Sequence, residues 1–140
     1  MNSSPENQQT QAILTGFYQS VAEKNPETIA SFFADAVDWY IPKSNLLPWT
    51  GKLTKKSEIA KALQLLFDAH VDGEDQFEPG HLFIDGPEAA VFGKASRVVK
   101  KTGKRFTTPF CQRFTMAEGK ITHFLMLEDT PEIEKAFKGN

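Results

Sequence analysis

The feature that most constrains the fold is a pair of alternating apolar segments joined by one tight turn. Residues 106–115 place phenylalanines at even positions, which is the period of a strand with one apolar face. Residues 120–129 form the second segment, and Glu118-Gly119 is the turn signal between them. The pattern predicts an antiparallel hairpin in a curved sheet. Its phenylalanine face also carries Gln112, which indicates that this face lines a cavity and not a dry core.

The rest of the chain predicts helices first and strands afterwards. Apolar residues at helical spacing predict a helix over 6–23. Asn25-Pro26 stops it and opens a second helix whose apolar stripe reaches Phe33. The other expected elements are a strand over 36–42, a loop over 43–53, a helix from a cap at Thr54 to Gly73, strands from residue 74 onward, one of them over 89–100, and a last helix capped by Thr130. This order is typical of an α+β fold with helices on one face of a bent sheet.

Length and charge set the broad class. A chain of 140 residues fits a single domain over 1–140, and we expect the polar start, residues 1–7, to be flexible. The net charge is −2 with scattered basic residues, so we expect no nucleic-acid partner. We expect no membrane partner, since no apolar run approaches the roughly 20 residues that span a bilayer. We also expect no secretion signal, since the start is polar with no basic residues and no apolar run. The only cysteine, Cys111, excludes an internal disulfide, and we expect a cytoplasmic protein.

The element order, with FFADAVDWYIP, the Gly51 loop before a helix, the turn KTGK and the segment EGKITHFLMLED, resembles a known group of proteins. This is the SnoaL-like and ketosteroid-isomerase-like branch of the nuclear transport factor 2-like superfamily, and the resemblance covers residues 8–138. It implies a cone-shaped curved antiparallel sheet wrapped around N-terminal helices, with a deep pocket at one end. It also implies a homodimer paired through the outer face of the sheet. Activities in this superfamily range from steroid isomerisation and polyketide ring closure to ligand binding alone.

The residues that carry isomerase chemistry in that family are not repeated here. The family's aspartate base on the first strand falls at Ile41. Its oxyanion-hole tyrosine falls at Phe17, with Tyr18 one step away. Its protonated aspartate falls near Gln112, or at Cys111 after a slip of one residue. Proton abstraction next to a carbonyl needs a carboxylate base, and Ile41 supplies none.

Strand period assigns candidate site residues to the inner faces of the strands. Glu128 is one, because a carboxyl in an aromatic cavity has its pKa raised by desolvation, toward a value useful in acid–base catalysis. Gln112 is the other, because its amide can hydrogen-bond a carbonyl or hydroxyl. Both are predicted as catalytic; the alternatives are a solvated Glu128 beside Asp129 and a Gln112 satisfied among strands. The predicted ligand-binding residues are Phe17, Trp39, Ile41, Trp49, His70, Arg97, Phe110, Phe114, Phe124 and Met126.

Three of these residues have a second interpretation. Arg97 can pair with Glu128 or with an acidic ligand group, although a position at the rim is the interpretation we favour. His70 reaches the pocket mouth or is a packed histidine, and Trp49 lies in the one loop long enough to act as a gate. The three histidines lack the spacing of a metal pair, so we expect neither a metal nor a cofactor.

Three functions remain open at this point. The first is an isomerase or cyclase acting on a small apolar cyclic molecule by acid–base chemistry. The second is a non-catalytic binding protein for a small hydrophobic ligand, favoured by the absence of a base at Ile41. The third is a subunit whose outer sheet contacts another protein. Both ligand functions require a cavity bordered by Trp39, Phe110, Gln112 and Met126.

Overall fold

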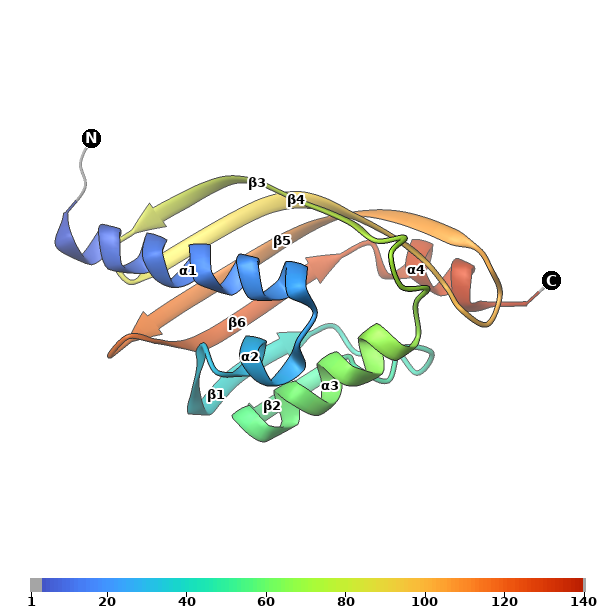
Figure 1. The fold of residues 1–140 in the computed structure, drawn as a ribbon, viewed down its shortest axis with the longest axis horizontal. Helices are drawn as coiled ribbons and strands as arrows, with labels where there is room; N and C mark the ends of the chain where they lie inside the picture. The colour runs from blue at the N-terminus through green and yellow to red at the C-terminus, as the bar shows by residue number, and fades with distance from the viewer. Residues whose placement is uncertain (1–3, 140) are drawn as a thin grey trace.

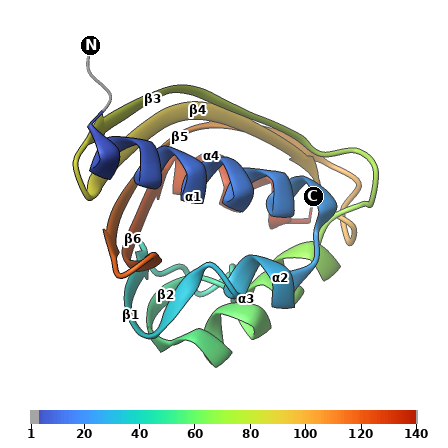
Figure 2. The same ribbon diagram turned by 60° about the vertical axis from the view of Figure 1, so that its left-hand side comes forward.

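The computed structural model of the protein describes residues 4–139, and its main feature is a six-stranded curved sheet with helices along the hollow side (Figures 1 and 2). The elements are α1 Pro5–Glu23, α2 Pro26–Ala30, β1 Phe33–Ile41, β2 Gly51–Lys55, α3 Lys56–Asp68, β3 Gln76–Asp85, β4 Glu88–Val98, β5 Arg105–Ala117, β6 Lys120–Glu128 and α4 Thr130–Phe137. The strand order is β2-β1-β6-β5-β4-β3, with antiparallel neighbours except for the parallel pair β1 and β6. The predicted α+β class and curved sheet are confirmed.

The helices lie on the hollow side of the sheet (Figures 1 and 2). In both views α1 lies under the arch of β3, β4 and β5, while α2 and α3 lie beside β1 and β2 (Figures 1 and 2). The inner face of the sheet therefore meets helices on one side and the loop before β2 at one end.

Between residues 4 and 139, no helix is long and apolar enough to cross a membrane.

The C-terminal hairpin forms as the sequence predicts. β5 and β6 pair antiparallel, and the two turn residues have positive φ, 51° at Glu118 and 78° at Gly119. Two successive left-handed residues make the turn whose twist matches that of the strands it joins. Gln112 lies opposite Met126 in the register. Strand parity therefore places Gln112, and Glu128 two residues beyond Met126, on the same inner face.

Close contact between β3 and β4 depends on a glycine. A Cβ added at Gly93 would lie 2.4 Å from the carbonyl oxygen of Glu78 and 2.7 Å from Cζ of Phe110. The register of β3 against β4 also shifts between Pro79 and Leu82. An irregular pairing of this kind bends the strand locally and increases its twist. The result is an arch high enough to cover α1.

Buried apolar side chains form two clusters. The larger one lies between α1, α2, α3 and the sheet and contains Phe17, whose ring contacts those of Phe33 and Phe114 at 5.9 and 5.6 Å. The smaller one joins α4 to the loop before β2 and includes Trp49 and Phe137, 5.6 Å apart. Burial of this much aromatic surface is the main stabilising contribution to the fold.

The start of the first helix and the end of the second differ from the sequence prediction. The Ser4 hydroxyl accepts the N–H of Asn7 and caps α1, which begins at Pro5; residues 1–3 lie outside the described part, and the flexibility of residues 1–7 stays a prediction. The second helix ends at Ala30, and Phe33 is instead the first residue of β1, fully buried. The five-residue helix ends early because β1 begins there to pair with β2 and β6.

Two helix caps also differ from the prediction. The third helix begins at Lys56 and not after Thr54, because Thr54 and Lys55 are the last residues of β2 and the Glu58 carboxylate accepts their backbone N–H groups. It ends at Asp68, well before Gly73. The last helix is capped by the carboxylate of Asp129, one residue before the predicted cap.

Candidate functional site

A cavity lies between the hollow face of the sheet and the helices. It holds about 80 Å³ for the centre of a water-sized sphere, several times the roughly 10–15 Å³ that one water needs. We call it the inner cavity. Its lining residues are Phe17, Val21, Ile29, Trp39, Ile41, Trp49, Ala62, Leu63, Leu66, Phe67, Phe77, Arg97, Phe106, Gln112, Phe124, Met126, Glu128 and Ile133.

Most of the predicted site residues line this cavity. Both residues predicted as catalytic do so, from neighbouring strands. The predicted ligand-binding residues that line it are Phe17, Trp39, Ile41, Trp49, Arg97, Phe124 and Met126. Trp49 is a buried wall and not an exposed gate, because its ring packs against those of His70 and Phe137. Their roles in binding or catalysis stay predictions.

Phe110 and Phe114 point inward as predicted, yet neither lines the cavity. Phe110 is stacked under Phe77, with ring centres 5.0 Å apart and planes 4° apart, so Phe77 takes the lining position. Phe114 is fully buried between Phe17 and Phe124. Other aromatic rings cover these two phenylalanines, so the cavity lining does not support their predicted contact with a ligand, which stays a prediction.

His70 does not reach the inner cavity either. Its ring is buried between Trp49, Phe106 and Phe137, and Nδ1 donates to the carbonyl oxygen of Leu66 at 2.7 Å. This burial lowers the pKa of His70 to about 4, which keeps the ring neutral at pH 7. The alternative of a packed histidine describes these surroundings, and the predicted contact of His70 with a ligand stays a prediction.

The remaining histidines lie elsewhere on the sheet. His81 is on β3, 4.6 Å from the ring of Phe83, and His123 is exposed on β6. Across residues 4–139, no three His, Cys, Asp or Glu side chains are grouped as metal ligands.

Glu128 carries the only carboxyl among the cavity-lining residues. It is partly buried at the end of β6, whereas the next residue, Asp129, is exposed. Burial raises the pKa of Glu128 to about 7, and the positive charge of Arg97 opposes this rise. Near neutral pH the carboxyl is therefore present both protonated and ionised, so it can give or take a proton. The alternative of a solvated Glu128 does not match this environment.

The Gln112 amide is held in one orientation. Tyr18 on α1 donates its hydroxyl proton to Oε1 of Gln112 at 2.6 Å, and Nε2 of Gln112 lies 3.6 Å from the sulfur of Met126. Burial raises the pKa of Tyr18, which keeps its hydroxyl neutral and able to donate. Because the amide oxygen is occupied, the NH₂ group is the part that remains for a ligand oxygen.

A second donor in the cavity wall belongs to Trp39. Its side chain is buried and lines the inner cavity, yet Nε1 has no hydrogen-bond acceptor in the described part of the chain. Buried Trp N–H groups usually find a partner. Trp39 can therefore donate to a ligand oxygen that enters the cavity.

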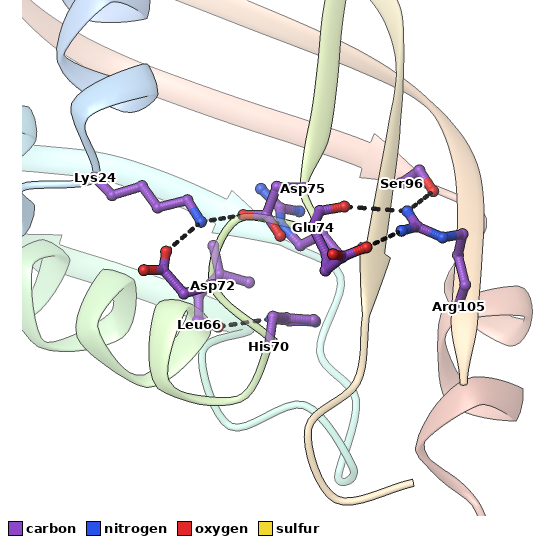
Figure 3. A network of polar contacts seen from close by, with 9 residues as sticks. Lys24, Leu66, His70, Asp72, Glu74, Asp75, Ser96 and Arg105 are labelled. Atoms are coloured by element: carbon purple, nitrogen blue, oxygen red, sulfur yellow. Dashed lines mark hydrogen bonds and ion pairs between the residues drawn. The ribbon is translucent and has the colours of Figure 1, made fainter. Parts of the chain in front are cut away.

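Charged side chains lie between the inner cavity and a polar groove outside it. This outer groove runs past α1 and the segment after α3, and Val21, Phe67, Phe77 and Arg97 line both it and the cavity. At its edge Lys24 lies between Asp72 and Asp75, with Nζ 3.2 and 2.7 Å from their carboxylate oxygens (Figure 3).

The guanidinium of Arg97 lies beside the same carboxylate. Its Nε is 3.7 Å from Oδ2 of Asp75, and both side chains are only 12% exposed. The favoured position of Arg97 at the rim is only partly correct, because the residue also lines the inner cavity.

Several site features were not predicted from the sequence. The hydrogen bond from Tyr18 to Gln112 joins residues 94 positions apart. Asp75 follows Gly73 in a loop, where no periodicity signals its burial. Phe77 is on an edge strand whose polar and apolar residues alternate weakly. Helical spacing could have identified Leu63, Leu66 and Phe67 as lining residues, since they lie on the apolar face of α3.

Comparison with known proteins agrees with this architecture. The family model described as a SnoaL-like domain matches residues 14–124. A search of the curated proteins finds no match to the chain.

Solved structures similar to this chain share its fold. An NTF2-like protein from Burkholderia thailandensis is 23% identical with a TM-score of 0.79, covering 93% of this chain and 97% of its own. A proposed polyketide cyclase from Xanthomonas campestris is 14% identical with a TM-score of 0.81, covering 95% and 99%. A proposed isomerase from Rhodopseudomonas palustris is 15% identical with a TM-score of 0.73, covering 97% and 98%. At these identities the likeness establishes the fold and not the activity.

Proposed function

Because the chain belongs to the SnoaL-like domain family, we propose that it is an isomerase or cyclase acting on a small apolar cyclic substrate. The observation that carries this proposal is the carboxyl of Glu128 in the inner cavity, with its pKa raised to about 7 by burial. General acid–base catalysis is most efficient when the catalytic pKa lies near the working pH. The related structures named as a proposed cyclase and a proposed isomerase are consistent with this chemistry.

Glu128 would move one proton within the substrate. The ionised carboxylate takes a proton from a carbon next to a carbonyl, and the electron pair of that C–H bond forms an enolate. In a substrate whose enolate extends into a neighbouring C=C bond, return of the same proton to the far carbon shifts that double bond and completes an isomerisation. In a cyclisation, the enolate carbon forms a bond to a second carbonyl carbon, and the proton held by Glu128 passes to the new alkoxide oxygen. Either sequence regenerates the carboxylate.

Two neutral donors would stabilise the enolate oxygen. The NH₂ group of Gln112 and the N–H of Trp39 both belong to cavity-lining side chains. Gln112 is opposite Met126 in the register, so Glu128 is its diagonal neighbour, with Cα atoms roughly 7–8 Å apart. The base and the donor therefore lie on adjacent positions of the same inner face. Donors fixed in a dry site stabilise developing charge more than water does.

The lining favours a small apolar substrate. Apart from Glu128, Gln112 and Arg97, the cavity walls are aromatic and aliphatic side chains. Small-molecule sites are typically mainly apolar with a few placed polar groups. A cyclic ketone of one or two rings has this character.

Exchange of α-protons in deuterium oxide tests the proposal without knowledge of the natural substrate. β-Tetralone, a bicyclic ketone, is incubated with the protein, and deuterium incorporation next to the carbonyl is followed by proton NMR. The wild-type protein should exchange these protons roughly 100-fold or more faster than Glu128→Gln, since general-base catalysis contributes at least this much. Glu78→Gln, an exposed change on edge strand β3, is the matched control and should match the wild type.

Equal exchange rates for the wild type and Glu128→Gln would contradict the catalytic proposal. In that case, shifts of Trp39 and Met126 signals on addition of β-tetralone would support a second function, a non-catalytic binding protein for a small hydrophobic ligand. The observation that favours this second function is Ile41, which lines the cavity where the family's isomerases would place their base. No binding of any kind would contradict both functions.

We also propose that the chain forms a homodimer through the outer face of the sheet. Phe83, Phe92 and Leu127 are 54%, 58% and 47% exposed there, and Cys111 lies between Phe92 and Leu127 in the register. A contiguous apolar patch of this kind on an antiparallel sheet supports an interface between copies. Sedimentation velocity should give twice the chain mass for the wild type and a monomer for Phe92→Glu. A monomeric wild type at micromolar concentration would contradict the dimer.

A further inference from the structure

Arg97 is a buried cation with an incomplete set of partners. Its side chain is 12% exposed, and its Nε–H has no hydrogen-bond acceptor among residues 4–139. The nearest carboxylate oxygen, Oδ2 of Asp75, lies 3.7 Å from Nε, which is an ion pair but too long for a hydrogen bond. A guanidinium presents five N–H donors in a planar fork that matches a carboxylate. Arg97 therefore retains donors that the protein does not use.

Asp75 does not fully pair with Arg97, because its carboxylate is shared with Lys24. The same oxygen, Oδ2, accepts Lys24 Nζ at the shorter distance of 2.7 Å, while Oδ1 has no donor in the described part of the chain. Lys24 also contacts Asp72, whose side chain is almost fully exposed (Figure 3). Lys24 and Arg97 together therefore present two cations to one buried carboxylate. A buried charge with incomplete pairing is costly and gains much from a further anion.

Arg97 also occupies the boundary between the outer groove and the inner cavity, because it lines both. A molecule that enters from the groove passes the guanidinium before its ring reaches Trp39 and Glu128. The groove lining also holds the cations Lys24 and Lys100 and the carboxylates Glu23, Asp68, Asp72 and Asp75, and Arg97 is the charged residue that it shares with the inner cavity. The position suits recognition of a negatively charged end of a ligand whose apolar end fills the cavity.

We propose that Arg97 binds a carboxylate on the substrate, so that the protein prefers small cyclic carboxylic acids to neutral ring compounds. The proposal rests on the proposed function, since it assigns the substrate class of the same cavity. The carboxylate accepts two parallel hydrogen bonds from the guanidinium. The apolar ring then extends toward Met126, Trp39 and Glu128. Arg97 is in this account a substrate-binding residue and takes no proton.

The other charged groups around Arg97 permit this arrangement. Burial raises the pKa of Glu128 to about 7, so at pH 6 it is mainly neutral and does not repel an anion. Burial keeps His70, which faces Arg97 from the segment after α3, neutral at the same pH. Asp75 is the carboxylate paired with Arg97, and Lys24 offsets it at 2.7 Å. Asp72, Asp68 and Glu23 also line the outer groove, and Lys24 pairs with Asp72 at 3.2 Å.

The alternative explanation is purely structural: Arg97 would tie β4 to the loop before β3 through Asp75. This role predicts a loss of stability when Arg97 is replaced but no preference for charged ligands. A comparison of two probes that differ only in charge separates the two roles. β-Naphthoate carries a carboxylate, and β-naphthamide carries a neutral amide of nearly the same shape.

Isothermal titration calorimetry at pH 6 measures the dissociation constants of both probes. The wild type should bind β-naphthoate at least tenfold tighter than β-naphthamide. Arg97→Met should lose that preference while its affinity for β-naphthamide stays within about twofold. Arg113→Met, a change on the outer face where Arg113 is 65% exposed, is the matched control and should keep the preference. Arg97→Lys keeps the charge but not the fork, and should reduce the preference several-fold; it decides the matter if Arg97→Met does not fold.

The outcomes separate the two proposals. Equal affinities for the two probes in the wild type, or a preference that survives both Arg97 substitutions, would overturn the carboxylate site while leaving the cavity as a site for neutral ligands. Failure of the wild type to bind either probe would overturn the proposed function together with it. A preference for β-naphthoate that is present in the wild type and in Arg113→Met, and lost only in the Arg97 variants, supports both the carboxylate site and the proposed function.

Discussion

Replacement of Glu128 by glutamine should stabilise the protein above neutral pH. The side chains are nearly the same size, so the change removes the ionisable group and leaves the cavity wall in place. In the folded protein, burial raises the pKa of Glu128 from its ordinary value of 4.5 to about 7. A carboxyl with a raised pKa favours the folded state at low pH, and this contribution is lost as pH rises from about 4.5 to about 7. Glutamine has no such loss.

The size of the effect follows from the two pKa values. Each unit of difference between the pKa values of the folded and unfolded states corresponds to about 1.4 kcal/mol. A rise of the pKa from 4.5 to about 7 therefore amounts to about 3 kcal/mol in the free energy of unfolding. This is an upper figure, because the denatured chain and partial solvent access both reduce it. For a chain of 140 residues it corresponds to a rise of roughly 6–12 °C in Tm. At pH 4 the two proteins should have equal stability.

Urea unfolding followed by tryptophan fluorescence at pH 4, 6 and 8 measures this difference. The gap between Glu128→Gln and the wild type should open progressively with pH, while Glu78→Gln follows the wild type throughout. A Glu128→Gln protein that is less stable than the wild type at pH 8 would refute the reasoning. It would mean that the ionised carboxylate is satisfied in the fold, most simply by a direct bond to Arg97.

Three further substitutions test neighbouring parts of the account by urea unfolding. His70→Asn should reduce the loss of stability that accompanies a fall in pH from 6.5 to 4. In the wild type, the pKa of the buried ring is lowered to about 4, so the unfolded chain takes up a proton in this range that the folded chain does not. An unchanged dependence of the free energy of unfolding on pH would contradict this. Gly93→Ala should cost about 1–3 kcal/mol through contact with Glu78 and Phe110. Gly139→Ala is the control and should leave the stability unchanged, because a Cβ added there would have no atom within 4 Å. Equal stabilities of Gly93→Ala and Gly139→Ala would contradict the close contact at Gly93. Tyr18→Phe should cost about 1–3 kcal/mol because the buried Gln112 oxygen loses its donor, and a neutral result would exclude that bond.

The sequence was most informative where periodicity and turn chemistry agree. Alternation across the C-terminal hairpin predicted that Gln112 and Glu128 share the inner face, and the register bears this out. Parity says which face a side chain occupies, but not what covers it. Phe110 and Phe114 lie on the predicted face and are covered by Phe77 and Phe17, from parts of the chain whose distance is set by the curvature of the sheet.

The charged part of the site could not be predicted for a similar reason. Arg97 was placed on the correct face of its strand, but whether such a side chain reaches solvent depends on a loop that packs over it. That loop brings Asp75 next to Arg97, and α1 brings Lys24 to the same carboxylate. These contacts join segments with no shared pattern. Helix ends were misplaced by smaller margins, because Glu58 and Asp129 compete with neighbouring residues for the same backbone donors.

The central claim is that a carboxyl in the inner cavity changes its charge near neutral pH. A direct measurement is the side-chain carboxyl carbon of Glu128, followed by carbon-detected NMR from pH 4 to 9 and assigned by its absence in Glu128→Gln. The account predicts a titration midpoint at about pH 7, consistent with the raised pKa of the buried group. A midpoint near 4.5, the ordinary value for glutamate, would contradict it.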